Sequence, residues 1–457
     1  MANRFKVYSK YKDSGVEWLR EVPESWEILR LKSLLNDPLK YGANELGESE
    51  DPILPRYIRI TDIDENNILR TESMKSLALE KAQDFLLEEG DLLFARSGAT
   101  AGKTFLYRSD WGKCAYAGYL IRARIRSDKA LSKFLRYFTD SGNYWSWIKS
   151  IYIQSTIQNI SAEKYSNISI AIPPLVDQQT IISFLDRETS RIDTLVSEQH
   201  HLIDLLKEKR QALISHAVTK GLDPNVKMKD SGVEWLGEVP EHWEVKRIKF
   251  AIATSRNGIW GDDPTGNDDT PCVRVADFNR DTLRVNAEIP TLRSISEKDR
   301  CGRLLRQGNL LLEKSGGGDK QPVGQVVLYD RDSDAVCSNF IAKIDLAPGE
   351  IPSFWCYQFA SVYSCGLNLR SIKQTSGIQN LDQEQYFDEL VPHPPISEQL
   401  AISSFLDRET SRIDTLISET ERAIELLKEH RQSLISAAVT GKIDVREEMK
   451  NAVEVSQ

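Results

Sequence analysis

The sequence predicts an α+β fold in which two pseudo-symmetric mixed α/β domains are separated by two long antiparallel coiled-coil helices. The first observation behind this prediction is a long internal repeat, and the second is a run of helical periodicity that closes each copy. The third is composition, because 40% hydrophobic and 28% charged residues among 457 are typical of a globular protein with its own cores.

The repeat consists of shared blocks that flank a variable block. KDSGVEWLREVPESWEI begins at Lys12 and returns as KDSGVEWLGEVPEHWEV at Lys229, and SFLDRETSRIDTL at residues 183–195 recurs unchanged at 404–416. Between these blocks the two copies have nearly equal lengths but different sequences. The period is far longer than that of a solenoid, so each copy is a whole domain plus a helix. We expect the halves to fold alike, related by a pseudo-two-fold axis.

Each copy ends in a predicted long helix, residues 173–221 and 394–441. Both ranges open with a Pro-Pro pair, whose rings block helix on their N-terminal side. Asp177 and Ser397 then offer caps for the first turn, and the glycine that closes each range terminates the helix.

The two predicted helices carry the pattern of a coiled-coil seam. Apolar side chains recur three, four or seven residues apart. Polar Gln199 and Thr420 occupy equivalent positions in the two helices, as expected of polar residues that specify the register of a coiled coil. The other faces are too charged for burial inside a globular core. Two such helices related by a two-fold axis would lie antiparallel, with the variable domains at opposite ends. The seam residues are Ile181, Leu185, Ile192, Leu195, Leu202, Leu206 and Leu213 in the first helix, and Ile402, Leu406, Ile413, Leu416, Leu427 and Leu434 in the second.

The variable blocks have the patterns of strands and loops with short helices. The same order of segments occurs in both copies, which predicts a common fold. In the first copy the predicted strands are YIRITDID from Tyr57, DLLFARSG from Asp91 and GYLIRARIRSD from Gly118, and a helical SKFLRYFTDSGNYWSWI follows them. In the second copy the predicted strands are CVRVADFN from Cys272, NLLLEKSG from Asn309 and GQVVLYD from Gly324.

Basic side chains recur at matching places of the two variable blocks, within strands or at the mouths of loops. An alternating Arg122, Arg124 and Arg126 would share one strand face, spaced for the phosphates of a duplex, although a solvated strand face is the alternative. The candidate nucleic-acid contacts are Arg59, Arg96, Ser97, Lys103, Arg122, Arg124, Arg126, Arg274, Lys314, Ser315 and Lys320.

The segment SGATAGKT, residues 97–104, ends like a P-loop but is not one. The motif needs a glycine where Ser97 stands and a helix where strand-like residues follow, and the second copy, SGGGDKQPVGQ, has no GK[ST] at all. We interpret both segments as flexible glycine-rich hairpin loops that bring backbone and lysine close to a ligand.

The sequence indicates no catalytic, metal or cofactor site of its own. The six cysteines form no CxxC pair, the six histidines show no ligand spacing, and the tetrapeptides of DNA methyltransferases are absent. The formal charge of −9 argues against indiscriminate coating of nucleic acid. Because there is neither a bilayer-length apolar run nor a signal-like start, we expect a cytoplasmic protein.

Together, these motifs resemble the specificity subunit of a type I restriction-modification system. The resemblance covers almost the whole chain and rests on the doubled SGVEWLxEVPExWE entry, on Gly-Asp/Asn-Leu-Leu followed by Ser-Gly (residues 90–98 and 308–316), and on the IQN segments that precede IPPL and HPPI. It implies an entry segment and target-recognition domain at 1–172, a second such domain at 222–393, and a tail at 442–457 to which we assign no role.

The resemblance also implies a division of labour. Each target-recognition domain would read one half of a split, asymmetric double-stranded DNA site in the major groove, and the helices would fix the gap between the halves. Two methyltransferase subunits would bind the shared regions and bring S-adenosylmethionine, with restriction or translocase subunits joining them. The chain itself would then be non-catalytic, without a cofactor, and would bind DNA weakly when alone.

Two other functions fit parts of the sequence. A coiled-coil scaffold joining two protein-binding domains would give no DNA footprint, and the targeting module of another DNA-modifying complex would differ only in its partner. A free-standing enzyme is disfavoured because no catalytic constellation is found.

Overall fold

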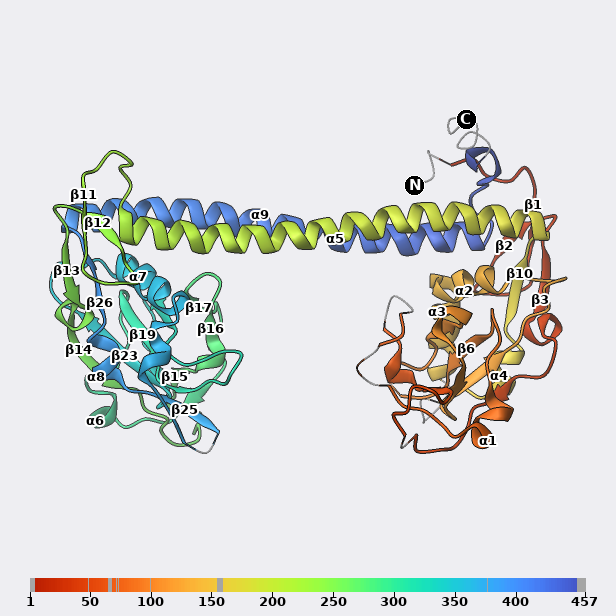
Figure 1. Cartoon of the computed structure of the whole chain (residues 1–457), viewed down its shortest axis with the longest axis horizontal. Helices are drawn as coiled ribbons and strands as arrows, with labels where there is room; N and C mark the ends of the chain where they lie inside the picture. The colour runs from red at the N-terminus through yellow and green to blue at the C-terminus, as the bar shows by residue number, and fades with distance from the viewer. Residues whose placement is uncertain are drawn as a thin grey trace. The chain divides into compact units, whose positions relative to one another are not determined.

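The computed structural model describes residues 5–449 except for 48, 65–67, 71, 73, 99, 154–158 and 376. The chain forms two compact units: Met1–Glu198 with Ala423–Gln457, and Gln199–Arg422. Each unit contains one entry segment, one variable domain and parts of both long helices (Figure 1). The two units therefore follow the repeat, but each draws its helical part from both copies. Parts of the first IQN segment (157–158), the first Ser-Gly loop (99) and the tail (450–457) lie outside the described residues.

The two predicted long helices are present as α5 (Leu175–Lys220) and α9 (Ile396–Val439). Each begins directly after its Pro-Pro pair, so Asp177 and Ser397, the expected caps, lie in the first turn instead. Gly221 adopts φ +80° directly after α5, the left-handed conformation that ends a helix at little cost in glycine. None of the helices in the described part of the chain is long and apolar enough to cross a membrane.

The two helices run antiparallel within each unit. In the first unit Asp177, near the start of α5, lies 3.7 Å from Arg446, which follows α9, while Asp193 further along α5 pairs with Arg431 of α9. The sequence numbers thus rise along one helix as they fall along the other. In the second unit, the end of α5 at Gly221 meets Trp243, whose indole nitrogen donates to Glu398 near the start of α9 at 2.9 Å.

The buried face of both helices differs in part from the predicted seam. Leu202 and Leu416 were expected in the seam but are 42% exposed, so this part of the prediction is wrong. A spacing of eleven residues, about 3.67 per turn, stays on one face of a nearly straight helix. Isoleucines at this spacing are at most 7% exposed: Ile181, Ile192, Ile203 and Ile214 in α5, and Ile402, Ile413, Ile424 and Ile435 in α9.

The first variable domain is built on a four-stranded antiparallel sheet of order β4-β9-β6-β7. Buried Phe94 and Ile121 of this sheet share a core with Phe134 and Phe138 of the adjoining helix α2, so the sheet is covered on this face. Separate pairs join β1 to β2, β3 to β10 and, in parallel, β5 to β8. The bounds are β1 Tyr11–Asp13, β2 Glu21–Pro23, β3 Glu27–Arg30, β4 Lys40–Tyr41, β5 Arg56–Ile58, α1 Leu79–Ala82, β6 Leu92–Ala95, β7 Thr104–Leu106, β8 Cys114–Tyr116, β9 Leu120–Ala123, α2 Ser132–Asp140, α3 Gly142–Ile153, α4 Ala162–Ser166 and β10 Ser169–Ile172.

The second variable domain repeats this plan with a larger sheet of order β14-β23-β19-β21-β17-β16. Its parallel pair β15–β22 corresponds to β5–β8, and helix α7 packs on β21 and β19 as α2 packs on β7. The bounds are β11 Met228–Asp230, β12 Glu238–Pro240, β13 Glu244–Arg247, β14 Ile252–Asn257, β15 Thr270–Val273, β16 Phe278–Asn279, β17 Arg284–Val285, β18 Leu292–Arg293, α6 Glu297–Arg300, β19 Asn309–Glu313, β20 Ser315–Gly316, β21 Val326–Tyr329, β22 Val336–Cys337, β23 Ile341–Leu346, α7 Pro352–Ser364, β24 Ile372–Thr375, β25 Ile378–Leu381, α8 Gln383–Phe387 and β26 Leu390–His393.

The repeated entry motif has a clear packing role. Trp26 and Trp243 are both fully buried, and each lies against the glycine that follows a long helix. A Cβ placed on Gly441 would come within 2.3 Å of Pro23 and 3.4 Å of Trp26, while one on Gly221 would come within 3.2 Å of Trp243. The Pro and Trp of VPExW thus pack against a bare backbone at the end of a helix, which explains why both copies retain them.

Candidate nucleic-acid interface

Five of the predicted nucleic-acid contacts are held by carboxylates of the chain itself. Arg59 and Arg274 precede the 3-10 helices Ile60–Asp62 and Val275–Asp277, one residue past the strands in which they were expected. Both guanidinium groups pair with the aspartate three residues on. The other three pairs are Arg122 with Asp37, Arg124 with Glu88 and Asp91, and Arg126 with Asp128.

The expected alternation of three arginines on one strand face is wrong. Strand β9 ends at Ala123, so only Arg122 lies in it, and the side chain of Arg122 is just 6% exposed. Arg124 is 23% exposed, and its pairing with Asp91 raises the pKa of its guanidinium group further. These two arginines already have structural ion-pair partners; their assignment as DNA contacts stays a prediction.

The other four cationic candidates surround the Ser-Gly loops. Among the described residues, no carboxylate lies within 4 Å of the charged groups of Arg96, Lys103, Lys314 or Lys320. Lys103 and Lys320 are exposed in the connections that follow β6 and β19. The predicted hairpins are confirmed here, because β6 pairs antiparallel with β7 and β19 with β21, and Thr104 begins a strand where a P-loop would need a helix.

The two Ser-Gly loops have the same register. Ser97 is paired with Asn159 in an isolated antiparallel bridge, and Ser315 of β20 is opposite Asn380 of β25. Neither asparagine is among the contacts predicted from sequence, where the IQN segments supported only the family resemblance. The signal was available, because both asparagines belong to the one tripeptide that the variable blocks share at this point.

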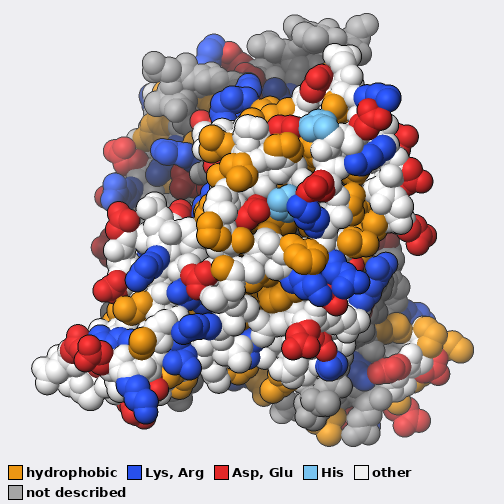
Figure 2. Space-filling view, turned by 90° about the vertical axis from the view of Figure 1, so that its left-hand side faces the viewer, with side chains coloured by type: hydrophobic (Ala, Val, Ile, Leu, Met, Phe, Trp, Pro, Cys, Tyr) orange, Lys and Arg blue, Asp and Glu red, His pale blue; other side chains and the backbone are white. Residues whose placement is uncertain are grey.

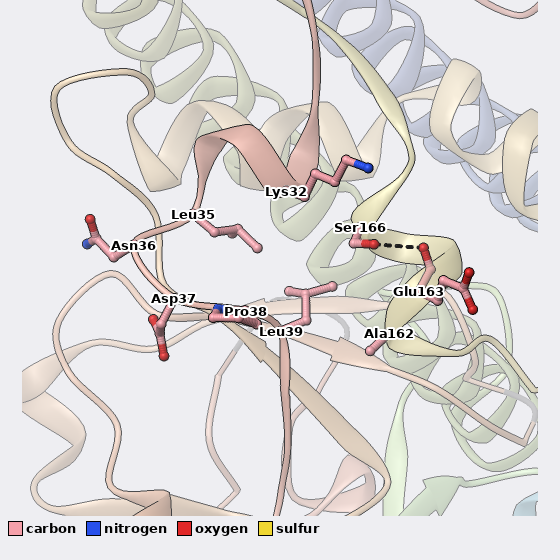
Figure 3. Close-up of a pocket in the computed structure, with 9 residues that line it drawn as sticks. All are labelled: Lys32, Leu35, Asn36, Asp37, Pro38, Leu39, Ala162, Glu163 and Ser166. Atoms are coloured by element: carbon pink, nitrogen blue, oxygen red, sulfur yellow. Dashed lines mark hydrogen bonds between the residues drawn. The ribbon is translucent and has the colours of Figure 1, made fainter.

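A shallow cavity of about 450 Å³ lies beside the first variable domain, between the 3-10 helix Leu31–Leu34 and α4 (Figure 3). Leu35 and Leu39 turn toward its middle, Lys32 donates to Asn167 at 3.1 Å, and Ser166 donates to the backbone of Glu163 at 2.8 Å. Lys32 and Ser166 are thus engaged in local hydrogen bonds, and Asp37 of the lining pairs with Arg122.

The buried thiols are unsuited to act as nucleophiles. Burial raises the pKa of Cys114, Cys337 and Cys356 to about 12 and that of Cys272 to about 11, so all four stay protonated at neutral pH. Within the described ranges, no three His, Cys, Asp or Glu side chains are grouped so that they could hold a metal ion.

Charges of both signs are mixed on the face drawn in Figure 2. On the face drawn in Figure 2, Lys and Arg side chains alternate with Asp and Glu and with apolar groups. This face gives no broad field for a polyanion, and the cations at the Ser-Gly loops are the better candidates for contacts with DNA.

Comparison with known proteins finds relatives of similar length. Residues 23–201 match the model of the type I restriction modification DNA specificity domain. The EcoKI specificity subunit of the type I restriction enzyme of Escherichia coli (strain K12) is 23% identical over 449 residues, covering 94% of this chain and 92% of that protein. The StySPI specificity subunit of Salmonella potsdam is 22% identical over 444 residues, with the same two shares covered.

Solved structures show the same fold. A chain from a study of complex assembly and conformational transition of the type I R-M system matches with a TM-score of 0.67 at 15% identity, covering 92% of this chain and 98% of that one. The HsdS subunit from Thermoanaerobacter tengcongensis matches with a TM-score of 0.51 at 16% identity and the same coverage. The predicted α+β fold with paired long helices is therefore confirmed. With its doubled entry motif, the chain is similar over almost its whole length to the specificity subunits of type I restriction enzymes.

Proposed function

We propose that the chain reads a bipartite, asymmetric DNA site, with one half-site for each variable domain. The observation that carries this proposal is the combination of a common framework with different loop side chains. The two domains have the same sheet order at their centre and the same register at the Ser-Gly loops, yet Arg96 in one corresponds to Lys314 in the other. Two readers of one fold with unlike side chains suit two unlike half-sites.

In this proposal the long helices set the gap between the half-sites. A row of buried isoleucines every eleven residues favours nearly straight helices, and straight helices transmit a length reliably. Half-sites on one duplex recur at about 34 Å per turn, so a fixed helix length would select a fixed number of intervening base pairs.

The chemistry belongs to partner subunits in this proposal. Because the entry motif and the helix block each occur twice, two copies of one methyltransferase subunit would dock on them and bring S-adenosylmethionine. Restriction subunits would join the same assembly. A chain of net charge −9 neutralises few phosphates by itself, so DNA binding should depend on the partners.

The test is to coexpress the chain with its methyltransferase subunit and to map methylated bases across a genome. We expect a two-part motif with a constant gap, and exchange of residues 26–172 for another recognition domain should change only one half. An unbroken palindrome or no new methylation would contradict the proposal. A protein scaffold would give no methylation motif, and a targeting module of another complex would copurify with a different enzyme.

A further inference from the structure

We infer that two equivalent side-chain clusters, one in each variable domain, make the base contacts: Arg96, Tyr119 and Asn159 in the first, and Lys314, Phe340 and Asn380 in the second. The inference rests on the proposed function and names the side chains that would give each half-site its sequence. We call them the first and second reading clusters.

Both clusters are built on the same ladder of backbone hydrogen bonds. The amide nitrogen of Arg96 donates to the carbonyl oxygen of Tyr119 at 3.0 Å, and its own carbonyl oxygen accepts from Ile160 at 2.8 Å. In the second domain Lys314 donates to Phe340 at 2.9 Å and accepts from Leu381 at 2.8 Å. The basic residue thus lies between the segment with the aromatic ring and the segment with the asparagine, in both domains.

The side-chain amide of the asparagine in each cluster is oriented by a hydrogen bond that its oxygen accepts. In the first cluster, Arg96 Nε donates to Asn159 Oδ1 at 3.3 Å, and in the second, Ser315 Oγ donates to Asn380 Oδ1 at 2.7 Å. Within the described ranges, neither amide nitrogen donates a hydrogen bond. Two N–H donors therefore remain available on each asparagine, and the held oxygen fixes which edge of the amide is presented.

The rest of each cluster is also unusual for a purely structural role. The rings of Tyr119 and Phe340 are 66% and 42% exposed, although large apolar rings normally gain stability from burial. The guanidinium group of Arg96 lies 4.8 Å from the centre of the Tyr41 ring, which restrains it by a cation–π contact without neutralising its charge. By contrast, Arg59, Arg122 and Arg274 have aspartate partners within the chain.

This chemistry fits the major groove of double-stranded DNA. Amide and guanidinium donors match the acceptors that base edges present there, purine N7, guanine O6 and thymine O4, and an exposed ring suits the thymine methyl group. Arg96 can donate to two acceptors of one base at once, whereas Lys314 offers a single ammonium group. The clusters therefore predict a shared mode of reading with different preferred bases.

The test substitutes each asparagine in the full chain, coexpressed with the methyltransferase subunit, and maps methylated motifs. Asn159→Ala should relax one position of the half-site read by the first domain, lowering discrimination there on the order of tenfold or more, and should leave the other half-site intact. Asn380→Ala should do the converse. The unchanged half-site reports in each case that the complex still assembles.

Matched controls and a second variant keep the result decisive. Asn167→Ala and Asn225→Ala replace exposed asparagines outside the clusters and should leave both half-sites unchanged. If an alanine variant abolishes all methylation, the corresponding aspartate variant, Asn159→Asp or Asn380→Asp, is tested instead. Aspartate has nearly the same shape as asparagine but lacks the N–H donors. Full discrimination in these variants would overturn the inference, while the bipartite motif of the unmodified chain would still uphold the proposed function.

Exchange between the clusters provides an independent test. Arg96→Lys with Tyr119→Phe gives the first cluster the side chains of the second, and we expect a changed base preference at one or two positions of the first half-site only. An unchanged motif would argue against these side chains as base contacts.

Discussion

The two units place the same helix sequence in different surroundings. In the first unit, Arg431 of α9 pairs with Asp193 of α5, and the two side chains are 33% and 53% exposed. In the second unit the equivalent pair, Arg210 of α5 with Asp414 of α9, is only 10% and 30% exposed. Residues 279–282 of the second variable domain line the same cavity of about 510 Å³ as this pair. The exposure of equivalent ion pairs on the long helices therefore depends on the variable domain that packs beside them.

The central sheets differ in the same way. Strand β19 ends in Glu313, whose side chain is 2% exposed and pairs with Arg280 at 2.6 Å, whereas Ala95 ends the corresponding strand β6. Burial raises the pKa of Glu313, against the opposing effect of Arg280. Divergence has thus placed a charge inside one domain where the other has a methyl group, without changing the order of the four central strands.

The largest expected effect comes from breaking this buried pair. Arg280→Ala leaves Glu313 buried without a cation, and we expect a loss of about 3 kcal/mol in the free energy of unfolding at neutral pH, measured by urea denaturation of the full chain. A carboxyl with a raised pKa stabilises the folded state below its unfolded pKa, and this stabilisation is lost as the pH rises through the folded pKa. The loss should therefore shrink as the pH falls toward 4.5, the ordinary value for Glu313.

The double variant Arg280→Ala with Glu313→Ala serves as the control. It gives β19 the alanine of β6 and removes both charges, so it should cost less than Arg280→Ala alone. A cost of Arg280→Ala that does not depend on pH would show that Glu313 is not the group responsible.

A second prediction concerns a feature that the units share. Ile203 and Ile424 are equivalent residues, 7% and 3% exposed, in the second and first unit respectively. Replacing either by alanine should lower the free energy of unfolding by about 2.5 kcal/mol. Leu202→Ala, next to Ile203 but 42% exposed, should cost less than about 1 kcal/mol. Equal costs at positions 202 and 203 would contradict the eleven-residue seam.

The helices themselves could be predicted from sequence because their signals are local. Each begins after a Pro-Pro pair and is followed within two residues by a glycine of positive φ, features that depend only on backbone geometry. The buried face of the helices was predicted less well. Spacings of three and four residues favoured Leu202, which is exposed, whereas the isoleucines eleven residues apart in the sequence are buried. Over a long helix the small difference between 3.5 and 3.6 residues per turn decides which side chain is buried.

The candidate contacts were harder to predict because their partners are distant in sequence. Arg122 pairs with Asp37, 85 residues away, and no local pattern distinguishes such an arginine from one that faces a phosphate. Arg59, in contrast, pairs with Asp62 three residues on, which the sequence could have revealed. The reading clusters required the fold, since Arg96 and Asn159 are 63 residues apart and are brought together by the bridge between Ser97 and Asn159 and by the backbone hydrogen bond from Ile160 to Arg96.

The smallest expected effect concerns the two equivalent ion pairs between the long helices, Arg210 with Asp414 and Arg431 with Asp193. Arg210→Ala leaves Asp414 partly buried without its cation, and burial already raises the pKa of that carboxyl, so we expect a loss of about 2 kcal/mol in the free energy of unfolding. Arg431→Ala removes the exposed equivalent and should cost less than about 1 kcal/mol, a cost that high salt should largely abolish. Urea denaturation of both full-length variants at low and high salt measures the difference. Equal costs would mean that the second variable domain does not alter the environment of the shared helices, and a larger cost for Arg431→Ala would reverse the assignment of which unit shields its ion pair.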